Sequence, residues 1–118
     1  MVGKEELEEY EAEIPLEPQS VYEATVIRIF KGKLRDLIDI NAIRSDTLRE
    51  RMKKNADRDA LEVWYDVDGK QYKEVVLISR HPNSKLIKIL KTYGKLEKGM
   101  KIQVYTTKWG YPRIKVKQ

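Results

Sequence analysis

The sequence contains no cysteine, a single histidine and no long apolar run. Without cysteine the chain cannot form a disulfide framework or a thiolate metal site. No apolar stretch approaches the roughly 20 residues that a membrane-spanning helix needs, and the start, MVGKEELEEY, lacks the apolar centre of a secretory signal. We therefore expect a cytoplasmic chain that does not cross a membrane. Its 118 residues predict one folded domain.

Side-chain patterns that carry catalysis are also scarce. His81 precedes Pro82 and is expected in a loop rather than as a general base. The aspartates show neither the spacing of a metal site nor that of a catalytic pair. The sequence has no glycine-rich phosphate loop and no nucleophile elbow. We expect neither an enzyme nor a bound cofactor.

Charge is plentiful and unevenly distributed. Residues 1–18 contain seven Glu and one Lys, a balance of −6, whereas the remaining hundred residues contain 23 Lys and Arg against 12 Asp and Glu, a balance of +11. The basic balance points to a polyanionic partner, although solubility alone explains it equally well. The abundance of Lys, Glu and Ile resembles the composition of thermophilic proteins, those of hyperthermophilic archaea included.

The acidic residues predict a flexible tail over 1–19, because Pro15 and Pro18 disfavour regular structure and the segment has little apolar surface to bury. The folded domain is expected over 20–118. Two roles for the tail stay open. It either competes with a polyanion for the basic domain or recruits a partner protein.

Segments rich in β-branched and aromatic residues predict strands. VYEATVIRIF forms the first, ending at Lys31-Gly32, and LEVWYDV and QYKEVVLIS flank Asp68-Gly69, a strong signal for a two-residue hairpin turn. HPNSKLIKILKTYGKLEKGM then predicts a short helix, capped by Asn83 or Ser84 and ended by Gly94. MKIQVYTTK and YPRIKV form a second hairpin.

This order predicts a mainly β chain folded as a five-stranded OB-fold barrel, with its helix between strands 3 and 4. About thirty residues, KLRDLIDINAIRSDTLRERMKKNADRDA, separate strands 1 and 2. Within them SDTLRERMKKN predicts a helix capped by Ser45 or Asp46, so the insertion is partly helical. An SH3-like barrel has the same strands but does not call for a three-turn helix before the fourth strand.

The Asp68-Gly69 turn places Trp64 opposite Lys73 if no bulge intervenes. Side-chain alternation then gives one apolar face, interrupted only by Glu74, and leaves Trp64 among charged residues on the other. An outward Trp beside a Lys suits base stacking with a nearby phosphate contact. A bulge in the strand would instead turn Trp64 into the core.

Trp109 and Tyr111 fall at the turn of the second hairpin, where a barrel offers no interior. A ligand surface explains them, although Trp109 folded back as a lid on the barrel end is the alternative. The four cations of the insertion helix either contact phosphates or complement the helix dipole. The candidate nucleic-acid-binding residues are Trp64, Lys73, Tyr105, Lys108, Trp109, Tyr111, Arg113 and Lys115, with Arg49, Arg51, Lys53 and Lys54 in the insertion.

Through HPNSKLIKILKTYGKLEKGMKIQVYTTKWGYPRIKV and LEVWYDVDGKQYKEVVLIS, residues 21–118 resemble OB-fold single-stranded nucleic-acid-binding proteins of the archaeal kind. The resemblance implies binding of single-stranded DNA or RNA, with DNA favoured, little sequence preference and no catalysis. The long insertion and the acidic N-terminus depart from that pattern. The alternative is a protein-interaction or assembly module, in a homodimer or with another protein, whose contact patch comprises Trp64, Val75, Leu77 and Trp109.

Overall fold

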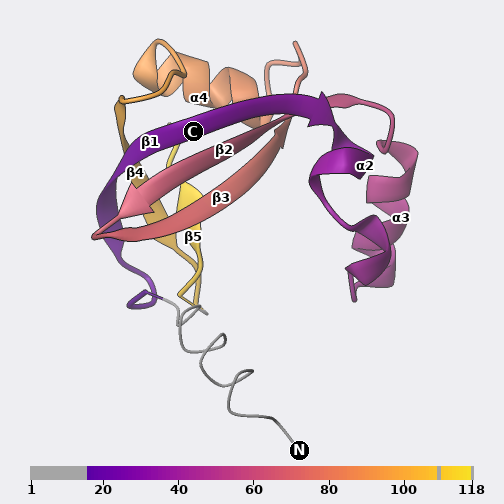
Figure 1. Ribbon diagram of the computed structural model, residues 1–118, viewed down its shortest axis with the longest axis horizontal. Coiled ribbons are helices and arrows are strands. Elements are labelled where there is room, and N and C mark those ends of the chain that lie inside the picture. Colours follow the sequence, from indigo (N-terminus) through magenta and orange to yellow (C-terminus); the bar gives the residue numbers. More distant parts are fainter. Residues whose placement is uncertain (1–15, 109, 118) are drawn as a thin grey trace, which may run out of the picture.

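Five antiparallel strands form a curved, nearly closed sheet in the computed structural model, which describes residues 16–108 and 110–117 (Figure 1). The strand order is β3-β2-β1-β4-β5. The strands are β1 (Val21–Lys33), β2 (Asp59–Val67), β3 (Lys70–Leu77), β4 (Lys101–Thr106) and β5 (Pro112–Ile114). The long β1 pairs with β4 along its first part and with β2 along its second. The prediction of a mainly β chain is confirmed.

Helical segments occupy two of the connections. Between β1 and β2 lie α2 (Leu34–Leu37), the 3-10 helix η1 (Ile40–Ala42) and α3 (Asp46–Lys54), and α4 (Lys85–Tyr93) lies between β3 and β4. Of the helices in the described part of the chain, none is long and apolar enough to span a membrane.

The two longer helices begin at serine caps. The hydroxyl of Ser45 accepts a hydrogen bond from the backbone N–H of Leu48, and that of Ser84 accepts one from Ile87, each at 3.3 Å. Gly94 ends α4 with a φ of 80°, the left-handed conformation that glycine adopts without strain. Among the alternatives at each predicted cap, Ser45 and Ser84 are therefore the residues used.

The β2–β3 hairpin has the predicted register. Asp68 and Gly69 have φ values of 51° and 85°, so both central residues are left-handed, as a type I′ turn requires. Trp64 accordingly lies opposite Lys73, and Tyr65 lies opposite Tyr72.

The inner face of the sheet holds the core, to which α4 contributes Ile89. Tyr65 is fully buried, and its hydroxyl donates a hydrogen bond to the carbonyl of Pro112 at 3.3 Å. Burial raises the pKa of Tyr65, and the nearby carboxylate of Glu74 acts in the same direction. The buried core residues are Ala24, Val26, Val63, Tyr65, Val67, Val76, Ile89, Ile102, Val104 and Ile114.

β1 carries a bulge between Val26 and Arg28. Val26 pairs with the inward-facing Tyr65, whereas Arg28 pairs with Trp64 and Ile29 with the inward-facing Val63. The extra residue therefore reverses the alternation of β1, a usual consequence of a bulge. Without it Arg28 would point into the core.

The described chain begins at Leu16, which packs against the core. The hydroxyl of Thr106 donates a hydrogen bond to the carbonyl of Glu17 at 2.7 Å and accepts one from the N–H of Ser20 at 2.7 Å. Residues 16–20 are therefore held beside the end of β4, although the predicted tail extends to residue 19. The rest of that tail, residues 1–15, lies outside the described residues.

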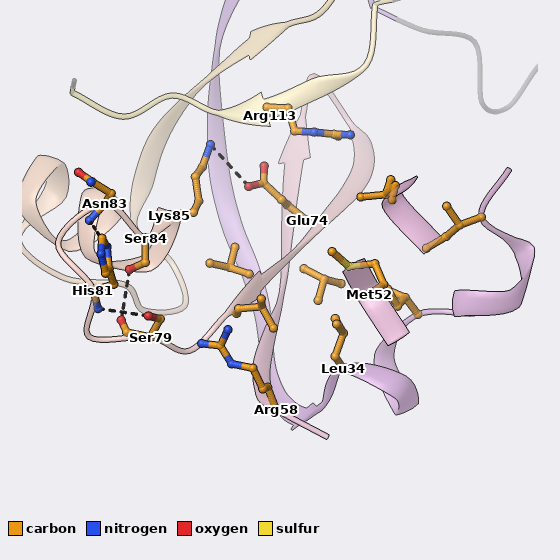
Figure 2. Close-up of a pocket in the computed structure, with 16 residues that line it drawn as sticks. Leu34, Met52, Arg58, Glu74, Ser79, His81, Asn83, Ser84, Lys85 and Arg113 are labelled. Atoms are coloured by element: carbon orange, nitrogen blue, oxygen red, sulfur yellow. Dashed lines mark hydrogen bonds and ion pairs between the residues drawn. The ribbon is translucent and has the colours of Figure 1, made fainter. Parts of the chain in front are cut away.

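Glu74 connects the two edges of the sheet, β3 and β5 (Figure 2). Its Oε1 accepts a hydrogen bond from the N–H of Ile114 at 2.9 Å, and its Oε2 lies 3.6 Å from Nζ of Lys85. Lys85 Nζ in turn donates to the carbonyl of Ile114 at 2.6 Å. The side chains of Glu74 and Lys85 thus satisfy both backbone groups of Ile114, which explains the carboxylate on the apolar face.

We expect Glu74→Ala to lower the free energy of unfolding by about 1–3 kcal/mol, because it leaves the Ile114 N–H without its acceptor. Glu74→Gln keeps an acceptor oxygen and removes only the ion pair, so its effect should be smaller. Urea denaturation measures both. The control is Glu97→Ala, which removes a surface carboxylate paired with Lys95 and should change stability by less than about 0.5 kcal/mol. Equal stability of Glu74→Ala and this control would contradict a closing role for Glu74.

Candidate nucleic-acid interface

Three side chains form a row across the outer face of β1, β2 and β3. Trp64 is paired with Arg28 on β1 and with Lys73 on β3. The guanidinium carbon of Arg28 lies 4.7 Å from the centroid of the indole, and Nζ of Lys73 lies 5.5 Å from it. The indole faces outward, as the predicted register requires. A bulge in β2 would have turned the indole inward, but the β2–β3 register is continuous and the bulge lies in β1.

The cations beside Trp64 do not prevent a base from stacking on it. A cation–π contact at an exposed site contributes about 0.5–1 kcal/mol, whereas stacking of a base on an aromatic side chain contributes about 1–3 kcal/mol. A base can therefore displace one cation at a net gain. The displaced Arg28 or Lys73 remains within reach of a phosphate on the same strand.

Neighbouring groups orient the row and extend it. Nε1 of Trp64 donates a hydrogen bond to Glu62 at 2.6 Å, and Arg28 donates one to the side chain of Gln71 at 3.3 Å. Phe30, which pairs with Glu62 across β1 and β2, is 49% exposed. A second aromatic ring thus stands on the outer face beside Trp64.

Lys73 and Arg113 line one depression of about 350 Å³, together with Ile38, Glu74 and Val75. All of these residues except Lys73 also line a larger cleft, of about 730 Å³, between the insertion and β3 (Figure 2). The structure thus brings Trp64, Lys73 and Arg113 together beside a cleft that the sequence did not lead us to expect.

The remaining cations and aromatic residues of the second hairpin lie elsewhere. Tyr105 and Lys115 line a separate cleft of about 470 Å³ with Lys85 and Lys88. Nζ of Lys85 lies 5.9 Å from the centroid of the Tyr105 ring. This cleft is basic, and it shares Lys85 and Asn83 with the larger one.

The loop between β4 and β5 holds the other predicted residues. Tyr111 is 46% exposed, and Lys108 is also exposed. Trp109 lies outside the described residues, so its role as a stacking residue or as a lid stays a prediction.

The insertion cations are not brought to the Trp64 row. Arg49 donates a hydrogen bond to the carbonyl of Ile43 at 2.8 Å and also pairs with Asp46. Lys53 lies 3.6 Å from Glu50, while Arg51 and Lys54 are exposed. From α3, Leu48 and Met52 line the large cleft, and none of the four predicted cations does.

Arg28 and Phe30 belong to this surface although the sequence reasoning did not select them. Strict alternation from Ala24 and Val26 assigns Arg28 to the core. The available signal was the three-residue spacing between the apolar residues Val26 and Ile29, which indicates a bulge between them.

Among residues 16–108 and 110–117, no group of three or more His, Asp or Glu could hold a metal ion. Comparisons with protein-family models, curated proteins and solved structures find no match to this chain. The outer face of β1–β3 and its adjoining cleft are therefore the candidate functional site.

Substitution of neighbouring residues on opposite faces of β2 should separate surface from core. We expect Trp64→Ala to lower the free energy of unfolding by no more than about 1–2 kcal/mol, the sum of two cation–π contacts. Tyr65→Ala should lower it by about 3–5 kcal/mol, because it empties a fully buried site. Chemical denaturation gives both values, and a decrease for Trp64→Ala as large as that for Tyr65→Ala would show that the indole is part of the core.

Proposed function

We propose that the chain is an OB-fold domain that binds single-stranded nucleic acid and catalyses no reaction. The order of the elements supports this assignment, with α4 between β3 and β4 and a partly helical insertion between β1 and β2. The outer face of β2 and β3, with the connection between β1 and β2, is the region where this fold class binds oligonucleotides. The resemblance of residues 21–118 to archaeal single-strand binders implies the same ligand class.

The observation that carries the proposal is the row of Arg28, Trp64 and Lys73. It combines an outward aromatic ring with cations on both neighbouring strands, the arrangement that lets any base stack while its phosphates are neutralised. On this proposal bases stack on Trp64 and Phe30, and phosphates pass Lys73 and Arg113. Stacking and phosphate contacts tolerate every base, so we propose little sequence preference. We retain DNA as the favoured strand and RNA as the alternative.

A second function, recognition of another polypeptide, is favoured by the apolar cleft. Val75 and Leu77, which belong to the predicted contact patch, both line it. Salt dependence separates the two functions, because phosphate contacts weaken steeply as salt rises and apolar contacts change little.

Removal of the indole should weaken oligonucleotide binding selectively. We expect Trp64→Ala to raise the Kd for single-stranded oligo-dT by about 5- to 150-fold, the equivalent of about 1–3 kcal/mol of stacking. Trp64→Phe keeps an aromatic face and should retain most of the affinity. Fluorescence anisotropy with a labelled oligonucleotide gives these values, and matched duplex DNA and RNA establish the preferred ligand. Unchanged affinity of a correctly folded Trp64→Ala protein would contradict the proposed site.

The cations should determine how binding responds to salt. For a single strand, removing one phosphate-binding cation flattens the plot of log K against log salt by about 0.7. We therefore expect replacement of Arg28, Lys73 and Arg113 by Gln to flatten the slope by up to about 2. The charge-matched control replaces Lys91, Lys95 and Lys98, on and after α4, by Gln. Equal slopes for the two variants would mean that binding depends on net charge rather than on this face.

A further inference from the structure

The large cleft is apolar on both sides (Figure 2). Leu48 is 41% exposed, and α3 contains no buried residue, so the described chain leaves the apolar side of α3 uncovered. Burial of this surface would stabilise a complex by the hydrophobic effect. One side is lined by Leu34, Ile38, Ile43, Leu48 and Met52 of the insertion, and the other by Val75 and Leu77 of β3.

The charges around the cleft favour an acidic occupant. Arg58, Lys85 and Arg113 contribute three positive charges against one negative charge on Glu74, whose carboxylate is already engaged by Lys85 and Ile114. Within the described residues, Arg58 and Arg113 make hydrogen bonds to neutral groups and no ion pair. The lining contains no Phe, Tyr or Trp, the rings that form base-stacking platforms, and its single aromatic group is the imidazole of His81. The chemistry therefore fits an acidic, partly apolar peptide better than a base.

The N-terminal segment of the chain has this composition. Residues 1–15 contain six Glu and one Lys. Leu7, Tyr10 and Ile14 follow one another at spacings of three and four residues, the spacing that would align them along one side if the segment became helical on docking. An apolar stripe among carboxylates matches an apolar groove with a basic rim, as in helix-in-groove recognition.

The segment is also attached near the cleft. The described chain starts at Leu16, and Glu17 is held by Thr106. Thr106 pairs with Pro112, the residue before Arg113, which lines the cleft. Fifteen residues can extend over roughly 50 Å, and a short flexible tether gives an effective concentration on the order of millimolar.

We propose that this cleft is the docking site for the chain's own N-terminal segment, residues 1–15, with Leu7, Tyr10 and Ile14 against its apolar sides and glutamates near Arg58 and Arg113. The inference does not depend on nucleic-acid binding. If the proposed nucleic-acid path is also correct, the docked segment competes with a strand at Arg113.

Methionine methyl NMR on the full chain tests the contact. Met52 lines the cleft, Met100 packs against the core and Met1 lies in the segment, so the three methionines report on different regions. Replacing Leu7, Tyr10 and Ile14 together by Ser should shift the Met52 methyl resonance and leave that of Met100 unchanged. The control, Val2→Ser with Ala12→Ser, alters residues away from the stripe and should leave Met52 unchanged. A Met52 resonance that does not respond to the triple substitution would overturn the proposal.

Disulfide trapping supplies a second test, because the chain has no native cysteine. In full-length Tyr10→Cys/Leu48→Cys, diamide should accept two electrons and two protons from the thiols and leave an intramolecular disulfide. Linkage should be at least about tenfold faster than in the control Tyr10→Cys/Lys91→Cys, given a millimolar local concentration at the docked site. Equal rates in the two proteins would overturn specific docking. Disulfide-linked dimers at low protein concentration would overturn intramolecular docking in favour of a second copy.

Discussion

Closure of the barrel depends on the carboxylate of Glu74, which accepts a backbone hydrogen bond that a neighbouring strand would otherwise accept. β3 and β5 are the edges of the sheet, and Glu74 with Lys85 satisfies the N–H and C=O of Ile114 between them. An unpaired buried backbone group costs about 1–3 kcal/mol. At the buried Ile114, Glu74 and Lys85 therefore replace the backbone hydrogen bonds that β3 and β5 do not form with each other. Because Lys85 is also the first residue of α4, the same interaction fixes the helix that delivers Ile89 to the core. It also sets Arg113, the residue before Ile114, beside Lys73.

A second constraint, the bulge of β1, determines which β1 side chains reach the outer face of the sheet. The inserted residue keeps Val26 and Ile29 facing inward and moves Arg28 onto the outer face, opposite Trp64. A regular strand would have buried a guanidinium without a partner, at a cost far larger than that of a bulge. The conformation that protects the core therefore also supplies one of the two cations beside the indole.

The parts that the sequence predicted are those controlled by neighbouring residues. Asp68 and Gly69 set the hairpin because both must adopt positive φ, and the hairpin in turn determines the outward direction of Trp64. Local hydroxyl caps likewise placed α3 and α4. The reason for Glu74 on an apolar face was not predictable in this way, because its partner Ile114 is forty residues away. The apolar cleft was missed for the same reason, because Leu48 and Val75 are distant in the sequence and line one cleft only in the folded chain.

The arrangement also indicates how two acidic ligands would be distinguished by one basic domain. On the two proposals above, a nucleic-acid strand and the N-terminal segment would both present negative charge to Arg113, so charge alone would not separate them. Trp64 lies on the proposed path of the strand and outside the cleft lining, so a base on that path could stack on it and a segment docked in the cleft could not. The cleft, in turn, offers the segment apolar burial that a phosphate backbone cannot use. Stacking of about 1–3 kcal/mol per base accumulates with each base bound, whereas the tethered segment has a fixed effective concentration. If both proposals hold, a strand that engages Trp64 and Phe30 would compete with the segment by up to about 6 kcal/mol more than a strand that contacts the cations alone.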